Sequence, residues 1–187
     1  AQLYDVVFEA NNKWMLSANG TIFTYEFEAI IPGLLKRWYA ERKEMQRKMH
    51  DAGDNEIEKE YWDKRQLVKK INLNSLYGAI LNPGCRFFDM RIGQSVTLTG
   101  RCITKHMGAK VNEIIGGKYD HVGQSIIYGD TDSVYFSAHK TLAKEIESGS
   151  IPWTKESVIS LYDKIADEVN TTFTGYMNKA FHCPTTR

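Results

Sequence analysis

The run Tyr-Gly-Asp-Thr-Asp-Ser at residues 128–133 constrains the fold of this chain more than any other stretch. Two short runs rich in β-branched and aromatic residues flank it, at 125–127 and 134–137. Such runs around a Gly-Asp-Thr-Asp turn predict a β-hairpin. Asp130 and Asp132 then lie at its tip, and on an extended chain residues at this spacing point to the same face.

Two carboxylates on one face can converge on one cation. Mg²⁺ suits hard oxygen ligands at this spacing, because it takes one or two carboxylates and leaves its other positions to water and substrate phosphates. The alternative is a plain polar turn, since Asp and Gly are ordinary turn residues. Asp130 and Asp132 are therefore candidate metal ligands, and the rest of the chain decides between a metal site and a plain turn.

An antiparallel pair of helices is predicted upstream. Pro32 is expected to open the first helix, where its missing N–H costs nothing. That helix should end near His50 with Gly53 as the residue after its cap, and a second should begin near Glu56. The apolar face of the first helix is made by residues at helical spacing: Leu34, Leu35, Trp38, Met45 and Met49.

Arg42 lies at the border of this apolar stripe. It could snorkel, with its stem on apolar surface. It could also be held inward, where its guanidinium would fork onto an anion such as a phosphate. Periodicity alone leaves both interpretations open.

The second helix carries Lys70, Asn74 and Tyr77 within about 60° of one another. This face offers an ammonium that can neutralise a phosphate and an aromatic ring that can press on a sugar or base. Gly78 beside it leaves room for close backbone approach. A solvated charged face with Tyr77 half-buried is the alternative, and spacing alone does not exclude it.

The remaining patterns complete an α+β fold class, an antiparallel sheet covered by helices. Weak strand signals occur at 3–8 and 21–25, a core helix runs from about Ser95 to Gly116, and a last helix follows Thr154 as its N-cap. His106 on the core helix is interpreted as structural, since no second ligand is spaced to join it.

Composition excludes several classes of protein. Among 187 residues, 42% are hydrophobic and 12% aromatic, which is typical of a globular protein. The net charge of +1 does not by itself indicate a polyanionic partner such as a nucleic acid. Three widely spaced cysteines indicate reduced thiols rather than a disulfide frame or zinc site, and no apolar run is long enough for a membrane helix.

The run Lys-x-x-x-Asn-Ser-Leu-Tyr-Gly at 70–78 resembles the fingers motif of family B DNA polymerases, and 128–133 resembles their palm motif. Both motifs occur in the family's order. The replicative polymerases of T-even-like bacteriophages have residue sequences similar to those at 17–20, 41–44, 86–91 and 110–113. The resemblance covers about residues 14–187.

This resemblance implies a division into an N-terminal palm segment (1–31), a helical-hairpin fingers region (32–81) and a palm segment with the metal-binding hairpin (82–187). The implied reaction is primer extension with two Mg²⁺ ions. Asp132 and, secondarily, Asp130 would be the catalytic metal ligands. Arg42 and Lys70 would hold the triphosphate, and Asn74 and Tyr77 would line the pocket of the nascent base pair.

The implied partners are primer-template DNA, deoxynucleoside triphosphates and the remaining polymerase domains, with a sliding clamp as a further partner to consider and no membrane. The implied location is the cytoplasm of an infected bacterium. The sequence contains no Asp-x-x-Ser-Leu-Tyr-Pro stretch for the second metal-binding aspartate, and no thumb or exonuclease. We therefore expect a piece of a longer protein that, isolated, has no polymerase activity. Gln46 also replaces a basic residue one turn after Arg42.

Three rival interpretations differ in which of these features they explain. A non-catalytic nucleic-acid-binding module would explain the missing aspartate but not the paired carboxylates. Reverse transcriptases and nucleotide cyclases carry other residue patterns at the equivalent hairpin. A purely structural α+β domain would make both motifs coincidences.

Overall fold

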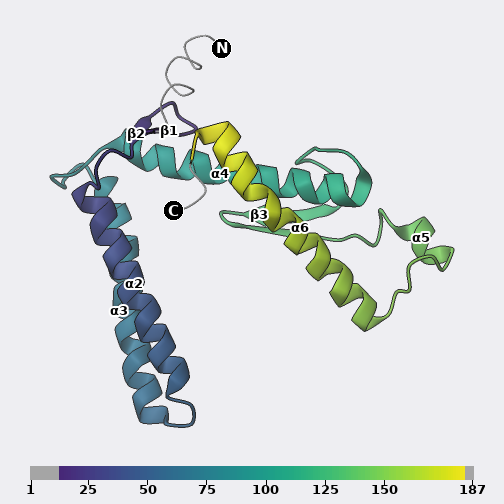
Figure 1. Ribbon diagram of the computed structural model, residues 1–187, viewed down its shortest axis with the longest axis horizontal. Coiled ribbons are helices and arrows are strands. Elements are labelled where there is room, and N and C mark those ends of the chain that lie inside the picture. Colours follow the sequence, from purple (N-terminus) through teal and green to yellow (C-terminus); the bar gives the residue numbers. More distant parts are fainter. Residues whose placement is uncertain (1–12, 184–187) are drawn as a thin grey trace. The chain divides into compact units, whose positions relative to one another are not determined.

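The computed structural model describes residues 13–183, which form an α+β fold as predicted (Figure 1). Each of the two sheets in this range has two strands. The first pairs β1 (Trp14–Leu16) with β2 (Ile22–Thr24), and the second pairs β3 (Ile126–Asp130) with β4 (Ser133–Phe136). The helices are α2 (Ile30–Asp51), α3 (Glu56–Ile80), α4 (Met90–Gly116), α5 (Ala143–Glu147) and α6 (Lys155–Phe181). The strand predicted at 3–8 lies outside the described residues.

The chain divides into two compact units. The helical-hairpin unit consists of Thr24–Gln94, and the carboxylate unit joins Ala1–Phe23 to Ser95–Arg187. The division into segments 1–31, 32–81 and 82–187 stays a prediction.

The helical-hairpin unit is built from α2 and α3, which run antiparallel (Figure 1). Gly53 follows α2 with a φ of +52°, and the Asn55 side chain caps α3 by accepting the backbone N–H of Glu58 at 3.3 Å. These residues confirm the predicted connection. Helix α2 starts at Ile30 rather than at Pro32. Pro32 therefore lies in the first turn, where a residue without an N–H is tolerated because first-turn N–H groups have no partner within the helix.

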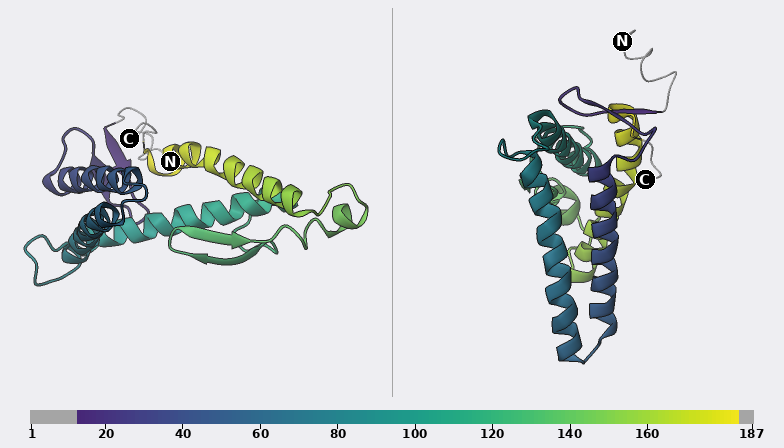
Figure 2. Two further views of the ribbon diagram at one scale, coloured as in Figure 1. Left: turned by 90° about the horizontal axis from the view of Figure 1, so that it is seen from below. Right: turned by 90° about the vertical axis from the view of Figure 1, so that its left-hand side faces the viewer.

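The core of the carboxylate unit lies between the β3–β4 hairpin and helices α4 and α6 (Figure 2). Helices α4 and α6 contribute most of its buried side chains, and Ile126 and Phe136 of the hairpin pack against them. The Phe136 ring stacks on Tyr162 with centroids 5.1 Å apart. The buried members are Val111, Ile115, Ala138, Ile165 and Val169.

Helix ends in this chain follow local chemistry. Thr154 caps α6 as predicted, accepting the backbone N–H of Ser157 at 3.4 Å, and Gly117 ends α4 with a φ of +73°. Helix α4 begins at Met90 rather than near Ser95. None of the helices within 13–183 combines the length and apolarity that a membrane span requires.

Candidate active site

The β3–β4 hairpin confirms the prediction drawn from residues 125–137. Asp130 pairs with Ser133 and Gly129 with Val134, so that 131–132 form a two-residue turn. The register shifts between Ile126 and Tyr128, which is the signature of a β-bulge. Both Asp130 and Asp132 are exposed at the tip.

The turn places the two carboxylates differently from an extended chain. Asp130 ends β3, whereas Asp132 lies in the turn itself, so the same-face rule for strands does not relate them. Thr131 between them has a φ of +43°, a left-handed conformation that is costly for a β-branched residue. The Thr131 hydroxyl donates to the Asp130 carboxylate at 3.0 Å, and that of Ser133 donates to the Asp130 carbonyl at 3.3 Å.

This pair fits part of a magnesium site. Two exposed carboxylates supply hard oxygens, and Mg²⁺ needs no more than one or two from a protein when water and phosphate complete its shell. Within residues 13–183 no third acidic, histidine or cysteine side chain joins them. A second metal ion would therefore need ligands from elsewhere.

Arg42 is half-buried on α2 and is held by the facing helix. Its Nε donates to Oε1 of Gln66 on α3 at 3.1 Å, and the Gln66 amide in turn donates to Asp63 at 2.9 Å. Among the described residues no carboxylate pairs with Arg42, and its two terminal amino groups have no hydrogen-bond partner. The guanidinium is thus fixed through one nitrogen and keeps a fork for an anion.

Lys70, Asn74 and Tyr77 lie on one face of α3, because the helix is continuous from Glu56 to Ile80. Lys70 is exposed, and in the described part of the chain it is the one cation of α2 and α3 that has no ion-pair, hydrogen-bond or cation–π partner. The neighbouring Lys69, by contrast, pairs with Glu41 across the helical hairpin. An ammonium left without a partner is available to an external anion.

Tyr77 is anchored within the same unit. Its hydroxyl donates to the carbonyl of Gly93 in the first turn of α4 at 3.1 Å. Gly93 is buried, and a Cβ placed there would lie 1.9 Å from Cδ2 of Leu81. The contact therefore depends on a glycine at this position, and it fixes the ring of Tyr77 at the end of the face that carries Lys70.

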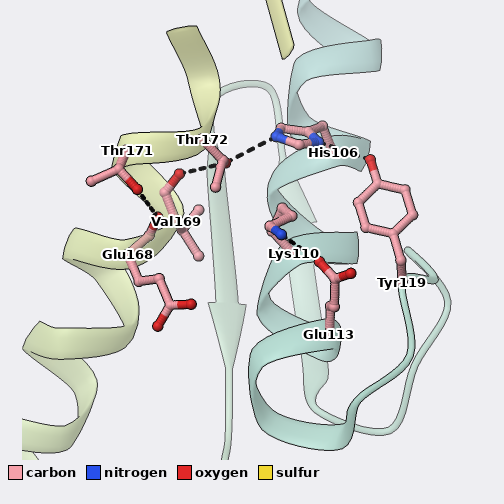
Figure 3. A network of polar contacts seen from close by, with 8 residues as sticks. All are labelled: His106, Lys110, Glu113, Tyr119, Glu168, Val169, Thr171 and Thr172. Carbon is pink, nitrogen blue, oxygen red and sulfur yellow. Dashed lines mark hydrogen bonds and ion pairs between the residues drawn. The ribbon is translucent and has the colours of Figure 1, made fainter. Parts of the chain in front are cut away.

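His106 is buried between α4 and α6, as the structural interpretation predicted (Figure 3). Its Nδ1 lies 2.8 Å from the Tyr119 hydroxyl, and its Nε2 lies 3.0 Å from Oγ1 of Thr172. The imidazole also stacks on the Tyr176 ring at 4.0 Å. Both nitrogens are used within the fold, so His106 is not a free metal ligand.

The Thr172 hydroxyl settles the tautomer of His106. It donates its single hydrogen to the Val169 carbonyl at 2.7 Å, so it must accept from Nε2–H. Nδ1 then accepts from the Tyr119 hydroxyl. Burial lowers the pKa of His106 below its usual value, the nearby Lys110 lowers it further, and Glu113 opposes the shift.

Two features that position these groups were not foreseen from the sequence. Thr104 of α4 donates its hydroxyl to the Thr131 carbonyl at 2.7 Å, and Gln66 holds Arg42. Neither pair gives a sequence signal, because the partners are 27 and 24 residues apart. A hollow of about 360 Å³ also occurs in the carboxylate unit, and the residues that line it include Asn112, Lys118, Ser125 and Thr141 but none of the candidate site residues.

Comparison with known proteins adds the family. The pattern of the family described as DNA polymerase family B matches residues 6–177. The DNA polymerase of Pyrococcus glycovorans is 32% identical over 152 residues, covering 81% of this chain and 17% of that protein. The DNA-directed DNA polymerase of Escherichia phage RB69 is 38% identical over 84 residues, covering 44% and 9%. The DNA polymerase delta catalytic subunit of Oryza sativa is 36% identical over 110 residues, covering 57% and 10%.

These relatives span phage, archaeal and eukaryotic sources, so the similarity is not specific to T-even-like phages. The chain spans less than a fifth of the length of each of them.

Proposed function

This chain belongs to family B of the DNA polymerases, and from that premise we propose that it is the fingers and part of the palm of a DNA-directed DNA polymerase. In the full-length enzyme, residues 32–81 are the fingers, and 82–187 with 1–31 are palm. The enzyme adds deoxynucleotides to the 3′ end of a primer on template DNA. The remaining palm, the thumb and the exonuclease belong to the rest of that enzyme, with a sliding clamp as its processivity partner.

Asp130 and Asp132 are the proposed metal ligands, with Asp132 the stronger. Their exposure at a hairpin tip supports this role, because substrate and water can complete the metal shell there. When bound, Mg²⁺ polarises the α-phosphate and neutralises charge on the attacking and leaving oxygens. The chain's own contribution is to hold two carboxylates on a short turn whose ends are fixed by β3 and β4.

Arg42 and Lys70 are the proposed triphosphate ligands. Lys70 has no partner in the described part of the chain, and Arg42 keeps two amino groups free of carboxylates, so neither must break an ion pair to bind phosphate. Fixed positive charge at this place stabilises the negative charge that grows on the departing pyrophosphate. Because Gln46 stands one turn after Arg42, these two cations carry the phosphate contacts that we propose.

Asn74 and Tyr77 are the proposed lining of the base-pair pocket. They share the face of Lys70, and the Tyr77 ring is fixed by its hydrogen bond to Gly93. A ring held in this way can press on a sugar or base without losing much side-chain freedom on binding. Gly78 next to them has open space where a Cβ would stand, which permits close approach.

We further propose that the source is a bacteriophage of the T-even-like group, and hence that the enzyme works in the cytoplasm of an infected bacterium. The residue sequences at 86–91 and 110–113 support this source, and so does the similarity to the polymerase of Escherichia phage RB69. Relatives from other sources make it a narrower proposal than the family.

Lys70 provides the test of this function. The observation that carries the proposal is that Lys70, alone among the cations of α2 and α3 in the described chain, has no partner on a face shared with Asn74 and Tyr77. In the full-length polymerase, Lys70→Ala should raise the nucleotide KM and slow incorporation by roughly 10- to 100-fold in kcat/KM, the loss of one charge-assisted contact. Pre-steady-state incorporation on a primer-template measures both quantities.

Lys64→Ala is the matched control, since Lys64 lies on the same helix but is paired with Glu60 at 2.7 Å. It should leave nucleotide kinetics unchanged. Equal kinetics for Lys70→Ala and wild type would contradict the assignment.

A non-catalytic nucleic-acid-binding module is the second candidate. It is favoured because no group of three or more acidic, histidine or cysteine side chains that could hold a metal ion occurs within 13–183. It predicts that neither Mg²⁺ nor Mn²⁺ binds at the hairpin tip, whereas the polymerase proposal predicts that both do.

A further inference from the structure

The carboxylate turn has one polar tether outside its own hairpin. In the described part of the chain, the Thr104 hydroxyl is the only polar group from another element that contacts residues 130–133. It donates to the Thr131 carbonyl at 2.7 Å. Thr131 is the residue between the two carboxylates.

The tether acts where the backbone is strained. Thr131 has a φ of +43°, and a β-branched residue keeps such a conformation only when its surroundings over-determine it. The strand register pairs Gly129 with Val134 and Asp130 with Ser133, which fixes the ends of the turn but not the peptide between Thr131 and Asp132. The Thr104 bond fixes the carbonyl of that peptide, and hence the direction in which Asp132 leaves the turn.

Thr104 lies on a packed segment of α4. It lies four residues before the buried Gly108, where an added Cβ would lie 3.8 Å from the side chain of Ile126 at the start of β3. The same hydroxyl also lies 3.1 Å from the Gly100 carbonyl within its own helix. A hydroxyl has a single hydrogen, so Thr104 can donate to only one of these carbonyls at a time. The shorter distance favours the hydrogen bond to the Thr131 carbonyl.

We infer that Thr104 is a positioning residue for the metal site, which holds the Thr131–Asp132 peptide so that both carboxylates face one cation. The inference rests on the proposed function, because it assumes that Asp130 and Asp132 bind metal. This positioning role requires the hydroxyl of Thr104 and not its methyl group. Thr104→Ser should therefore keep the role, and Thr104→Val should lose it.

Nuclear magnetic resonance of the ¹⁵N-labelled 187-residue chain tests this, with Mn²⁺ as the probe. Mn²⁺ broadens amide signals near its site even when it binds weakly. In wild type, added Mn²⁺ should selectively broaden the amides of 129–133. In Thr104→Val, the amides of 131–133 should already shift without metal, and equal broadening should need roughly fivefold more Mn²⁺, the effect of one hydrogen bond.

Two controls make the result specific. Thr104→Ser keeps the hydroxyl and should restore both the amide positions and the Mn²⁺ response. Thr171→Val removes a helical hydroxyl that donates to the Glu168 carbonyl of its own helix at 2.7 Å and to no other group among residues 13–183, and it should behave as wild type. If Val at 104 disturbs the whole spectrum, Thr104→Ala takes its place under the same criteria.

The outcomes separate the two claims. Unchanged turn amides and unchanged Mn²⁺ broadening in Thr104→Val, with broadening lost in the double variant Asp130→Asn/Asp132→Asn, would overturn the inference and leave the proposed function standing. The same holds if Thr104→Ser behaves as Thr104→Val. Wild-type chain without selective broadening, or broadening that persists in the double Asn variant, would overturn the proposed function and the inference with it.

Discussion

His106 illustrates how a titratable side chain can serve stability rather than chemistry. Its neutral form satisfies both ring nitrogens, with Nε2–H donating to Thr172 and Nδ1 accepting from Tyr119. Protonation would place a second donor against the Tyr119 hydroxyl and a charge next to Lys110. The lowered pKa of His106 follows from the same surroundings, with burial as the largest cause.

The free energy of unfolding should therefore fall in acid. The unfolded chain takes up a proton on His106 near pH 6.5, whereas the folded chain takes it up only at a lower pH. Stability from this group is complete above about pH 6.5 and is lost as the pH falls toward the folded pKa. His106→Leu should cost roughly 1–3 kcal/mol at neutral pH for two lost hydrogen bonds. It should also flatten the decline between pH 7 and pH 5.5 in urea unfolding, and a decline as steep as that of wild type would contradict the account.

Residue types at the candidate site could be predicted from the sequence, but their local contacts could not. The spacing of Lys70, Asn74 and Tyr77 needs only the period of a helix. The tether from Thr104 to Thr131 and the bond from Arg42 to Gln66 join residues of different elements. No periodicity records such pairs, so they emerge only with tertiary structure.

At the scale of elements, the helical hairpin is held by few buried contacts. Helix α2 has no buried residue, and the buried residue of α3 is Ile80 at its end. The two helices meet instead through contacts such as Arg42 with Gln66 and Lys48 over the Trp62 ring at 4.7 Å. A hairpin with so little buried apolar surface is expected to open locally more readily than the core of the carboxylate unit.

Gly93 is the residue on which the junction after α3 depends. Gly93→Ala should lower the free energy of unfolding by about 1–3 kcal/mol, because the added methyl group would meet Leu81. The loss should be partly relieved in Gly93→Ala/Leu81→Ala, so that the double variant is more stable than the two single losses predict. Gly78→Ala is the control, since open space surrounds that position and Ala favours a helix by about 1 kcal/mol. Urea unfolding measures all four, and a fully stable Gly93→Ala would contradict the packing argument.

The elements with regular patterns and caps were predictable, and those that depend on a single local bond were not. Gly53, Glu56, Gly117 and Thr154 mark helix ends as expected. Helix α4 begins at Met90 because the Asp89 carboxylate accepts the backbone N–H of Arg91 at 2.9 Å. The hydrogen bond from the Arg91 side chain also holds the pKa of Asp89 low, at about 2. Aspartate before a helix is a start signal that predicts this boundary. Helix α5, with five residues, is too short to show a period.

For the molecule as a whole, two-metal chemistry needs two sets of ligands, whereas residues 13–183 hold no group of three or more acidic, histidine or cysteine side chains that could bind a metal ion. The sequence has no Asp-x-x-Ser-Leu-Tyr-Pro stretch to supply a second set. The purified 187 residues should therefore add no nucleotide to a labelled primer-template in the presence of Mg²⁺ or Mn²⁺. A gel-based extension assay checks this, and any template-directed product from the chain alone would contradict it.

Single-turnover nucleotide incorporation by the full-length polymerase with Asp132→Asn tests whether the β3–β4 hairpin binds the catalytic metal. Asparagine keeps the shape of the side chain and removes its charge, so primer-template affinity should stay within about twofold of wild type while incorporation falls by at least 10³-fold, the scale of a lost group of the catalytic machinery. Asp163→Asn, which changes an exposed carboxylate of α6, should incorporate at the wild-type rate. Wild-type incorporation by Asp132→Asn would contradict the assignment of the hairpin to metal binding and with it the proposed function.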